Sequence, residues 1–228
     1  MTQKLKKTGA KSGSKFNLDL LNSTQKLAYA AFEQHDVLFL IGPAGTGKSF
    51  LSMAFAVNEV LRNNKSKIIL TRPIVESGEH LGFLPGSLEE KIHPYMMPLF
   101  DAMDKMLGPS KENPQREAIT TAVEMAPLAY MRGRNFTDAI CIFDEAQNAT
   151  YSQLKLFLTR FNPDTKLIIT GDPKQCDLLK RGDDIDLMDV VNKLKGIKGI
   201  GVINFTSEDI VRHRLVADIL DKLEPAND

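Results

Sequence analysis

Tryptophan is absent from this sequence of 228 residues, and cysteine occurs only twice, as Cys141 and Cys176. Neither cysteine lies at a spacing typical of a metal site. Cys141 falls within an apolar run, where a cysteine behaves as a small buried hydrophobic residue. This sparse use of cysteine fits a reducing environment, and we expect a cytoplasmic protein.

Long apolar runs are also missing. The longest, such as Val37–Ile41 and Ala139–Phe143, are far too short to span a bilayer, so no membrane association is expected. The N-terminal lysines are not followed by an apolar core, which argues against a signal peptide. An excess of one charge is absent as well, because 29 Lys and Arg balance 29 Asp and Glu. No global field therefore attracts nucleic acid, and any polyanion site must be local.

What is present fits one α/β domain after a short tail. Residues 1–16 carry five lysines, no acid and several small residues. Such a segment buries little apolar area, so we expect a disordered basic tail, either solvated or in contact with a polyanion. Hydrophobic residues make up 43% of the chain and charged residues 25%, as in ordinary globular proteins. We expect residues 17–228 to form the domain.

Five apolar runs predict the strands of this domain. Their residues are continuously apolar rather than alternating, which indicates strands covered on both faces. Helix-like segments separate them, so the sequence predicts an α/β fold with a doubly wound, mainly parallel sheet. The runs are Val37–Ile41, Lys67–Thr71, Ala139–Phe143, 166–170 and 201–205.

Helices are predicted over 23–34, 49–62, 87–107 and 206–220, with a linker at 108–114. Two prolines inside the third helix should kink it. Six of the nine methionines fall between residues 96 and 131. They form either adaptable core packing or a surface that repacks against a subunit or substrate.

A complete phosphate-binding motif, G-x-x-x-x-G-K-[ST], follows the first apolar run and opens the next helix. Its glycines let backbone N–H groups approach phosphate oxygens, and the helix N-terminus adds partial positive charge. The lysine should reach the β- and γ-phosphates, and the final serine should bind magnesium. The motif therefore predicts ATP and Mg²⁺ as ligands. Its residues are Gly42, Pro43, Ala44, Gly45, Thr46, Gly47, Lys48 and Ser49.

Two acids end the run at 139–143. We expect Asp144 to hold magnesium, since hard cations prefer oxygen ligands, and Glu145 to orient or deprotonate the attacking water. The run at 166–170 leads into Gly-Asp-Pro-Lys-Gln, and Gln175 is predicted to contact the γ-phosphate or the water. Alternatively, the acids form a helix N-cap and Gly171-Asp172-Pro173 forms a plain turn.

Together these residues resemble the PhoH-like family of RecA-like P-loop ATPases, which is related to superfamily-one helicases. The similarity covers roughly residues 17–222 and includes family-specific runs besides the phosphate and acid motifs. The matching runs are 21–25, Thr71-Arg72-Pro73, 81–86, 131–134, 144–148, 158–160, Gly171-Asp172 with Gln175, and 211–213.

This resemblance implies a RecA-like P-loop NTPase domain in which Gln25 reads the adenine edge. Related helicases place ATP between two RecA-like domains, whereas one is visible here. We therefore expect head-to-tail association, expected as a hexameric ring, with an arginine supplied in trans. Arg212 is favoured because 206–220 reads as a capped helix. The other candidates are Arg132, Arg134, Arg160 and Arg214.

Three functions remain open. The first is an ATPase that acts on nucleic acid, with RNA as the expected polymer, although no aromatic and basic platform is evident in the sequence. The second is a nucleotide-dependent switch or assembly protein with slow turnover. The third is a small-molecule phosphotransferase, which would need a dedicated acceptor pocket.

Overall fold

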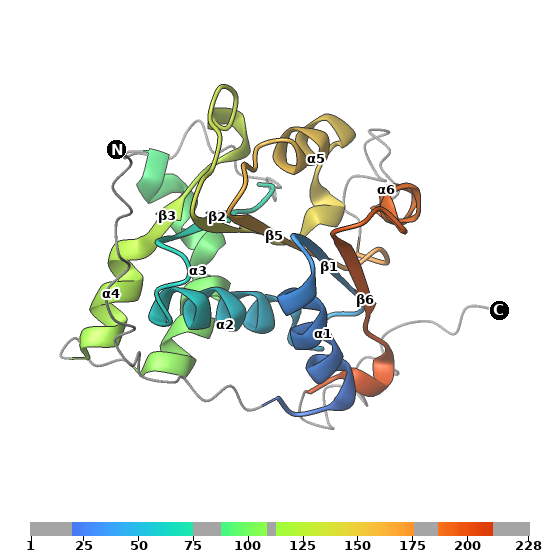
Figure 1. Cartoon of the computed structure of the whole chain (residues 1–228), viewed down its shortest axis with the longest axis horizontal. Helices are drawn as coiled ribbons and strands as arrows, with labels where there is room; N and C mark the ends of the chain where they lie inside the picture. Colours follow the sequence, from blue (N-terminus) through green and yellow to red (C-terminus); the bar gives the residue numbers. More distant parts are fainter. Residues whose placement is uncertain (1–19, 75–87, 109–112, 176–186, 212–228) are drawn as a thin grey trace, which may run out of the picture.

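The computed structural model describes residues 20–74, 88–108, 113–175 and 187–211. The predicted tail, Cys176, the run at 81–86 and the arginines at 212 and 214 lie outside these residues. The described part forms a six-stranded sheet in which every pairing is parallel. The strand order is β3-β2-β4-β5-β1-β6, and helices cover both faces (Figure 1). The predicted doubly wound parallel sheet is confirmed.

The strands match the apolar runs closely. Parallel pairing buries both faces, so side chains that alternate in direction are apolar on both sides. Even-numbered residues of the central strands face one hydrophobic cluster and odd-numbered residues face the other. The strands are β1 (Val37–Ile41), β2 (Lys67–Thr71), β3 (Val123–Met125), β4 (Ala139–Phe143), β5 (Thr165–Gly171) and β6 (Ile200–Asn204).

Six α-helices and three 3-10 turns are present in the described part of the chain. In Figure 1, α1 to α4 lie over one face of the sheet and α5 and α6 over the other. The helices are α1 (Ser23–Gln34), α2 (Lys48–Leu61), α3 (Leu88–Leu107), α4 (Pro114–Ala122), α5 (Tyr151–Leu158) and α6 (Leu187–Leu194). The 3-10 turns are η2 (Leu128–Tyr130), η3 (Ala146–Asn148) and η5 (Ser207–Asp209).

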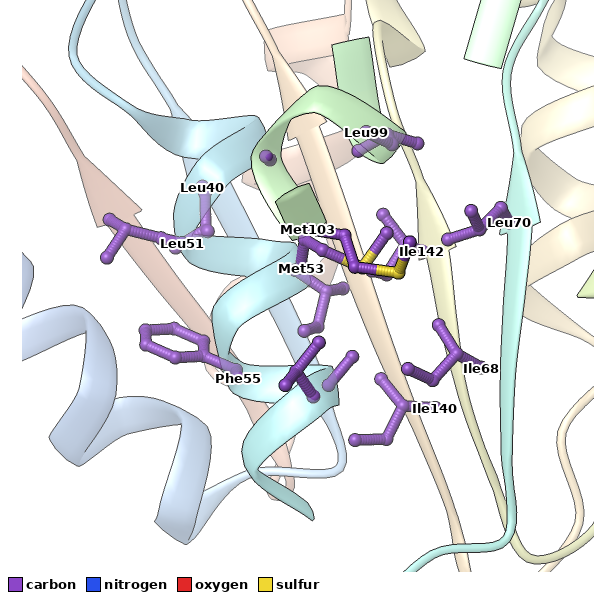
Figure 2. Packing of buried hydrophobic residues seen from close by; sticks show 14 of the residues in the cluster. Leu40, Leu51, Met53, Phe55, Ile68, Leu70, Leu99, Met103, Ile140 and Ile142 are labelled. Carbon is purple, nitrogen blue, oxygen red and sulfur yellow. The ribbon is translucent and has the colours of Figure 1, made fainter. Parts of the chain in front are cut away.

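The methionine-rich region belongs partly to the core. On α3, Met96 and Met103 are buried against α2 and the sheet, whereas Met97 is 39% exposed. Figure 2 shows Met103 and Leu99 of α3 beside Met53 of α2 and the β4 residues that face this cluster. α3 contains two prolines, and the flexible thioethers of Met96 and Met103 are suited to packing against such a helix.

Two sequence predictions of secondary structure were wrong. The linker predicted over 108–114 ends one residue early, because Asn113 caps α4 and Pro114 occupies its first turn, where a missing N–H costs nothing. The capping box at Thr206 opens only η5, since Ile210 is extended. The terminal helix predicted from residue 206 therefore does not begin there, and residues beyond 211 lie outside the described part.

Cys141 is fully buried in β4, and desolvation raises the pKa of its thiol far above the ordinary value. A thiol held neutral in the core is chemically inert, as expected for a small hydrophobic residue. Within the described residues, no helix combines the length and apolar character needed to cross a membrane.

Phe157 anchors α5 to the sheet, because its buried ring lies 4.9 Å from that of Phe143, centroid to centroid. We expect Phe157→Ala to lower the free energy of unfolding by about 3–5 kcal/mol, since it removes a large side chain and leaves a cavity. Urea denaturation monitored by circular dichroism measures this loss. Phe157→Leu is the control and should cost clearly less; equal stability of the alanine variant and the wild type would contradict this packing.

Candidate nucleotide-binding site

The phosphate loop joins β1 to α2 at the carboxyl edge of the sheet, where ligands of parallel α/β folds bind. Two of its glycines show why the backbone needs this residue type. Gly47 caps α2 with φ 85°, a left-handed conformation that glycine adopts without strain. At Gly42, an added Cβ would lie 2.5 Å from the carbonyl oxygen of Phe205, so β6 and the loop approach closely only because no side chain is present.

The loop encloses its lysine. Lys48 is 9% exposed, and its Nζ donates to the carbonyl oxygens of Gly42 and Pro43 at 2.7 and 2.8 Å. The ammonium group therefore lies inside the turn that the motif predicts for phosphate. The Ala44 N–H donates to Oδ2 of Asp172 at 3.0 Å, which ties the loop to the end of β5.

Both acids that end β4 reach this region. Asp144 is 1% exposed, and its Oδ1 accepts hydrogen bonds from the hydroxyl of Ser49 at 2.8 Å and from the hydroxyl of Thr170. Glu145 has φ 54° and ψ 45°, an uncommon conformation for a residue with a side chain. Such strain is retained where the surroundings impose it, which occurs often at functional sites.

Lys48, Ser49 and Glu145 share one pocket of about 360 Å³, and Asp144 contacts its wall through Ser49 and Thr170. The pocket is lined by loop residues, by Glu145 and Thr170 from the ends of β4 and β5, and by Lys105 of α3. A separate apolar hollow of about 340 Å³ lies at the opposite ends of the strands, near Val37 and Ile200. It is remote from the phosphate loop and does not contribute to this site.

Two further residues join the site that motif reasoning did not assign to it. Gln147 is 2% exposed; its Nε2 donates to Glu145, and its Oε1 accepts the Asp172 N–H at 3.0 Å. Arg72 follows β2, with its guanidinium 3.9 Å from Asp144 and 3.6 Å from Glu145. For Arg72 the available signal was its position directly after a strand, since polar residues at such positions meet at this edge of the sheet.

The other residues predicted for the site are Gln25, Gln175 and Arg212, and the two that the structure describes differ in their burial and in their relation to the pocket. Gln25 is 4% exposed beside Gly47, and its Oε1 accepts the Leu21 N–H at 2.8 Å. Gln175 is exposed after the turn that Asp172 begins, and it is not among the residues that line the pocket. Arg212 lies outside the described residues. Its neighbour Val211 lines the pocket, and the Val211 N–H donates to the Gly45 carbonyl at 2.9 Å.

Of the remaining arginines considered, Arg132, Arg134 and Arg160 do not line the pocket. The Arg134 guanidinium pairs with Glu124 at 2.5 Å, and Arg160 donates to the Leu156 carbonyl at the end of α5. Within one chain, these three arginines therefore do not complete the nucleotide site.

Arg72 provides a prediction for this site. Its Nη1 donates to the Tyr95 carbonyl of α3 at 3.1 Å, so it holds both acids against a fixed helix. Should this site hydrolyse ATP, we expect Arg72→Ala to lower kcat by about 10²-fold with little change in ATP affinity, because small displacements of catalytic groups have effects of this size. Steady-state kinetics and nucleotide titration separate the two effects. Arg72→Lys keeps the charge without the planar fork and should recover only part of the rate; an equal loss of affinity and turnover would contradict a positioning role.

The six-stranded parallel sheet, the loop around Lys48 and the paired acids define a RecA-like P-loop NTPase domain. The chain belongs to the family described as PhoH-like protein, whose model matches residues 17–224. The resemblance inferred from the motifs is thereby confirmed.

Curated relatives include PhoH-like proteins of Bacillus subtilis, 48% identical over 203 residues, and of Mycobacterium tuberculosis, 48% identical over 197 residues. Protein PhoH of Escherichia coli strain K12 is 40% identical over 194 residues. These alignments cover 85–89% of this chain but only 54–63% of the relatives. The chain thus spans between half and two thirds of their length.

Two solved structures support the fold. The large terminase of a thermophilic bacteriophage matches with a TM-score of 0.54 at 13% identity. The same terminase in complex with ADP gives 0.52 at 14% identity. Each match covers 89% of this chain and 50% of the terminase. At such low identity, the similarity concerns the fold alone.

Proposed function

We propose that this domain binds Mg-ATP at the Gly42–Ser49 loop and hydrolyses it. The observation that carries the proposal is the convergence of Lys48 and Ser49 with Asp144 and Glu145 on one edge of the sheet, although Ser49 and Asp144 are 95 residues apart in the chain. A binding loop alone needs only one acid; two acids with different surroundings suit a division between metal binding and water activation.

The donor set at Ser49 and Asp144 fits magnesium. Their oxygens lie 2.8 Å apart, and both are hard ligands of the kind that this cation prefers. Thr170 donates to the same carboxylate and thereby fixes its direction. A magnesium ion bound here would neutralise charge on the β- and γ-phosphates.

Glu145 is the proposed general base. Its carboxylate accepts from Gln147 and faces Arg72, so both oxygens are oriented by neighbours. Lys48 is proposed to bind the phosphate oxygens, and Gln175 to contact the γ-phosphate or water after a rearrangement of its turn. Gln25 is proposed to read adenine, because an amide offers one donor and one acceptor; adenine would compete with the Leu21 N–H for its oxygen.

We further propose a homo-oligomeric ring, expected to be hexameric, in which Arg212 acts on a neighbouring subunit. The pocket opens at the sheet edge, where an external arginine would stabilise developing charge. We expect Arg212→Ala to reduce turnover by about 10³–10⁵-fold. The measurement is phosphate release in saturating Mg-ATP, and sedimentation tests the assembly; a monomer under these conditions would contradict the ring.

A mixing experiment tests whether the arginine acts in trans. Arg212→Ala subunits keep the acid site, and Glu145→Gln subunits keep the arginine. Mixed rings should therefore regain activity that neither variant shows alone. If mixing restores nothing while both variants still assemble, the arginine acts within its own subunit or is not catalytic.

We propose that the protein uses ATP hydrolysis to act on nucleic acid, and we expect this polymer to be RNA. The expected location of the protein is the cytoplasm. Phosphate release measured with RNA, single-stranded DNA and small acceptors separates this function from the alternatives. Stimulation by polymer supports the proposal. Phosphate transferred to an acceptor identifies a phosphotransferase, and tight binding with negligible turnover identifies a switch or assembly protein.

A further inference from the structure

Two stretches of this neutral chain are basic and contain no acid. They are residues 126–137, which precede β4, and residues 149–163, which include α5. Their cations are Arg132, Arg134, Lys155 and Arg160. The fold places the two stretches side by side, because Phe136 and Phe161 form a parallel bridge and the Phe136 N–H donates to the Arg160 carbonyl at 2.9 Å. Positive charge is thereby concentrated on one face.

A groove of about 610 Å³ lies between these stretches. Leu128 and Arg132 line one side, and polar residues of α5, including Ser152 and Lys155, line the other. Arg132 and Lys155 are exposed, and neither forms an ion pair with another described residue. No acid of the described residues lines the groove. Among the described residues that line the groove, nothing neutralises the charges of Arg132 and Lys155. The charge of Arg134, in contrast, is paired with Glu124.

Two exposed aromatic rings lie near the residues of this groove, although neither ring is part of its lining. Tyr130, between the lining residues Leu128 and Arg132 in the chain, is 60% exposed. Tyr151 is 54% exposed and lines the apolar hollow near Val37, which shares Lys155 and Thr159 with the groove. Large rings left in water beside unpaired cations are the elements of a surface that binds unpaired bases and phosphates together. The sequence does not reveal this platform because its parts come from separate segments.

We propose that this groove binds a single-stranded nucleic acid, with Arg132 and Lys155 contacting phosphates and the two tyrosines stacking on bases. This inference rests on the proposed function, and it identifies the groove as the place where the nucleic acid binds. Exposed rings favour unpaired bases over a duplex, whose bases are already stacked, and over an acidic peptide, which offers no ring face.

The groove is also connected to the catalytic edge. Glu145 is the residue before η3. A few residues later, Thr150 caps α5 by accepting the Gln153 N–H, and Lys155 lies in the next turn of this helix. The helix that carries Lys155 thus begins at Tyr151, shortly after the acid motif. Strand binding along α5 would act on the same short segment that positions Glu145.

Fluorescence anisotropy with labelled single-stranded RNA and DNA oligonucleotides, over a range of salt concentrations, tests the proposal. Arg132→Ala/Lys155→Ala should lose on the order of tenfold in affinity for both sequence-independent probes. Its plot of log affinity against log salt should flatten by about 0.7 for each phosphate contact removed. Lys26→Ala, on α1 over the opposite face of the sheet, is the matched control and should bind as the wild type.

Tyr130→Ala supplies a second readout, because loss of stacking should weaken binding by about tenfold without changing the salt slope. The basal ATP turnover of Lys155→Ala should equal that of the wild type, while its stimulation by polymer falls. Comparison of RNA with DNA then shows which backbone is preferred.

Unchanged binding by the double variant overturns the proposal, and so does equal binding of a polyglutamate peptide to the wild type. If wild-type protein hydrolyses ATP but binds neither oligonucleotide, the groove assignment fails and the proposed ATPase stands. If it binds oligonucleotides through Lys155 but not ATP, the proposed function fails and the groove stands.

Discussion

Lys48→Ala should abolish useful binding of ATP, with an affinity loss of at least about 10²-fold. The Lys48 ammonium lies inside the phosphate loop on the carbonyls of Gly42 and Pro43, at the N-terminus of α2. Among the described residues that line this pocket, Lys48 is the only enclosed cation. Its removal would leave the triphosphate without that positive charge. Isothermal titration with Mg-ATP measures the loss.

The matched control for this change is Lys105→Ala. Lys105 lines the same pocket from α3 but is exposed, so water screens its charge and its removal should cost far less. Thermal unfolding of both variants confirms that each remains folded. If Lys48→Ala still bound Mg-ATP tightly, the assignment of the whole site would be wrong.

Glu145→Gln should bind Mg-ATP as the wild type does and lose about 10²–10⁴-fold in turnover. The amide keeps the size of the side chain but cannot accept a proton from water. Its neighbours Gln147 and Arg72 remain in place to orient it. Single-turnover phosphate release and nucleotide titration measure the two quantities separately.

Asp144→Asn distinguishes the two acids. Because Asp144 accepts from Ser49 and is proposed to hold magnesium, its loss should weaken binding of the magnesium complex as well as turnover. Glu145 should affect turnover alone. Normal hydrolysis by Glu145→Gln would mean that another group activates the water.

The apolar runs were sufficient to predict the main strands, because a strand buried on both faces needs an uninterrupted apolar sequence. β3 escaped this reasoning: it has three residues, all half-buried, with Glu124 at its centre. The short helix α5 carries polar residues on its exposed side and was not singled out. Edge and surface elements depend on neighbours that a single sequence does not reveal.

In the site, too, some features follow from the sequence and others depend on how the strands are arranged. The phosphate loop is contiguous, so its motif identifies it completely. Arg72 reaches the acids only because β2 pairs with β4 in a register that sets Thr71 against Phe143. Gln147 reaches Asp172 through the pairing of β4 with β5. Contacts of this kind follow from strand order, which propensity and periodicity leave undetermined.

The hydrogen bond from the Val211 N–H to the Gly45 carbonyl has a mechanical consequence. Gly45 belongs to the turn that would wrap a triphosphate, and Val211 is the last described residue before 212–228. Any shift of the turn on loading or release of nucleotide either pulls on this tether or breaks it. A change in the occupancy of the loop would therefore displace Val211 or release its N–H from the Gly45 carbonyl.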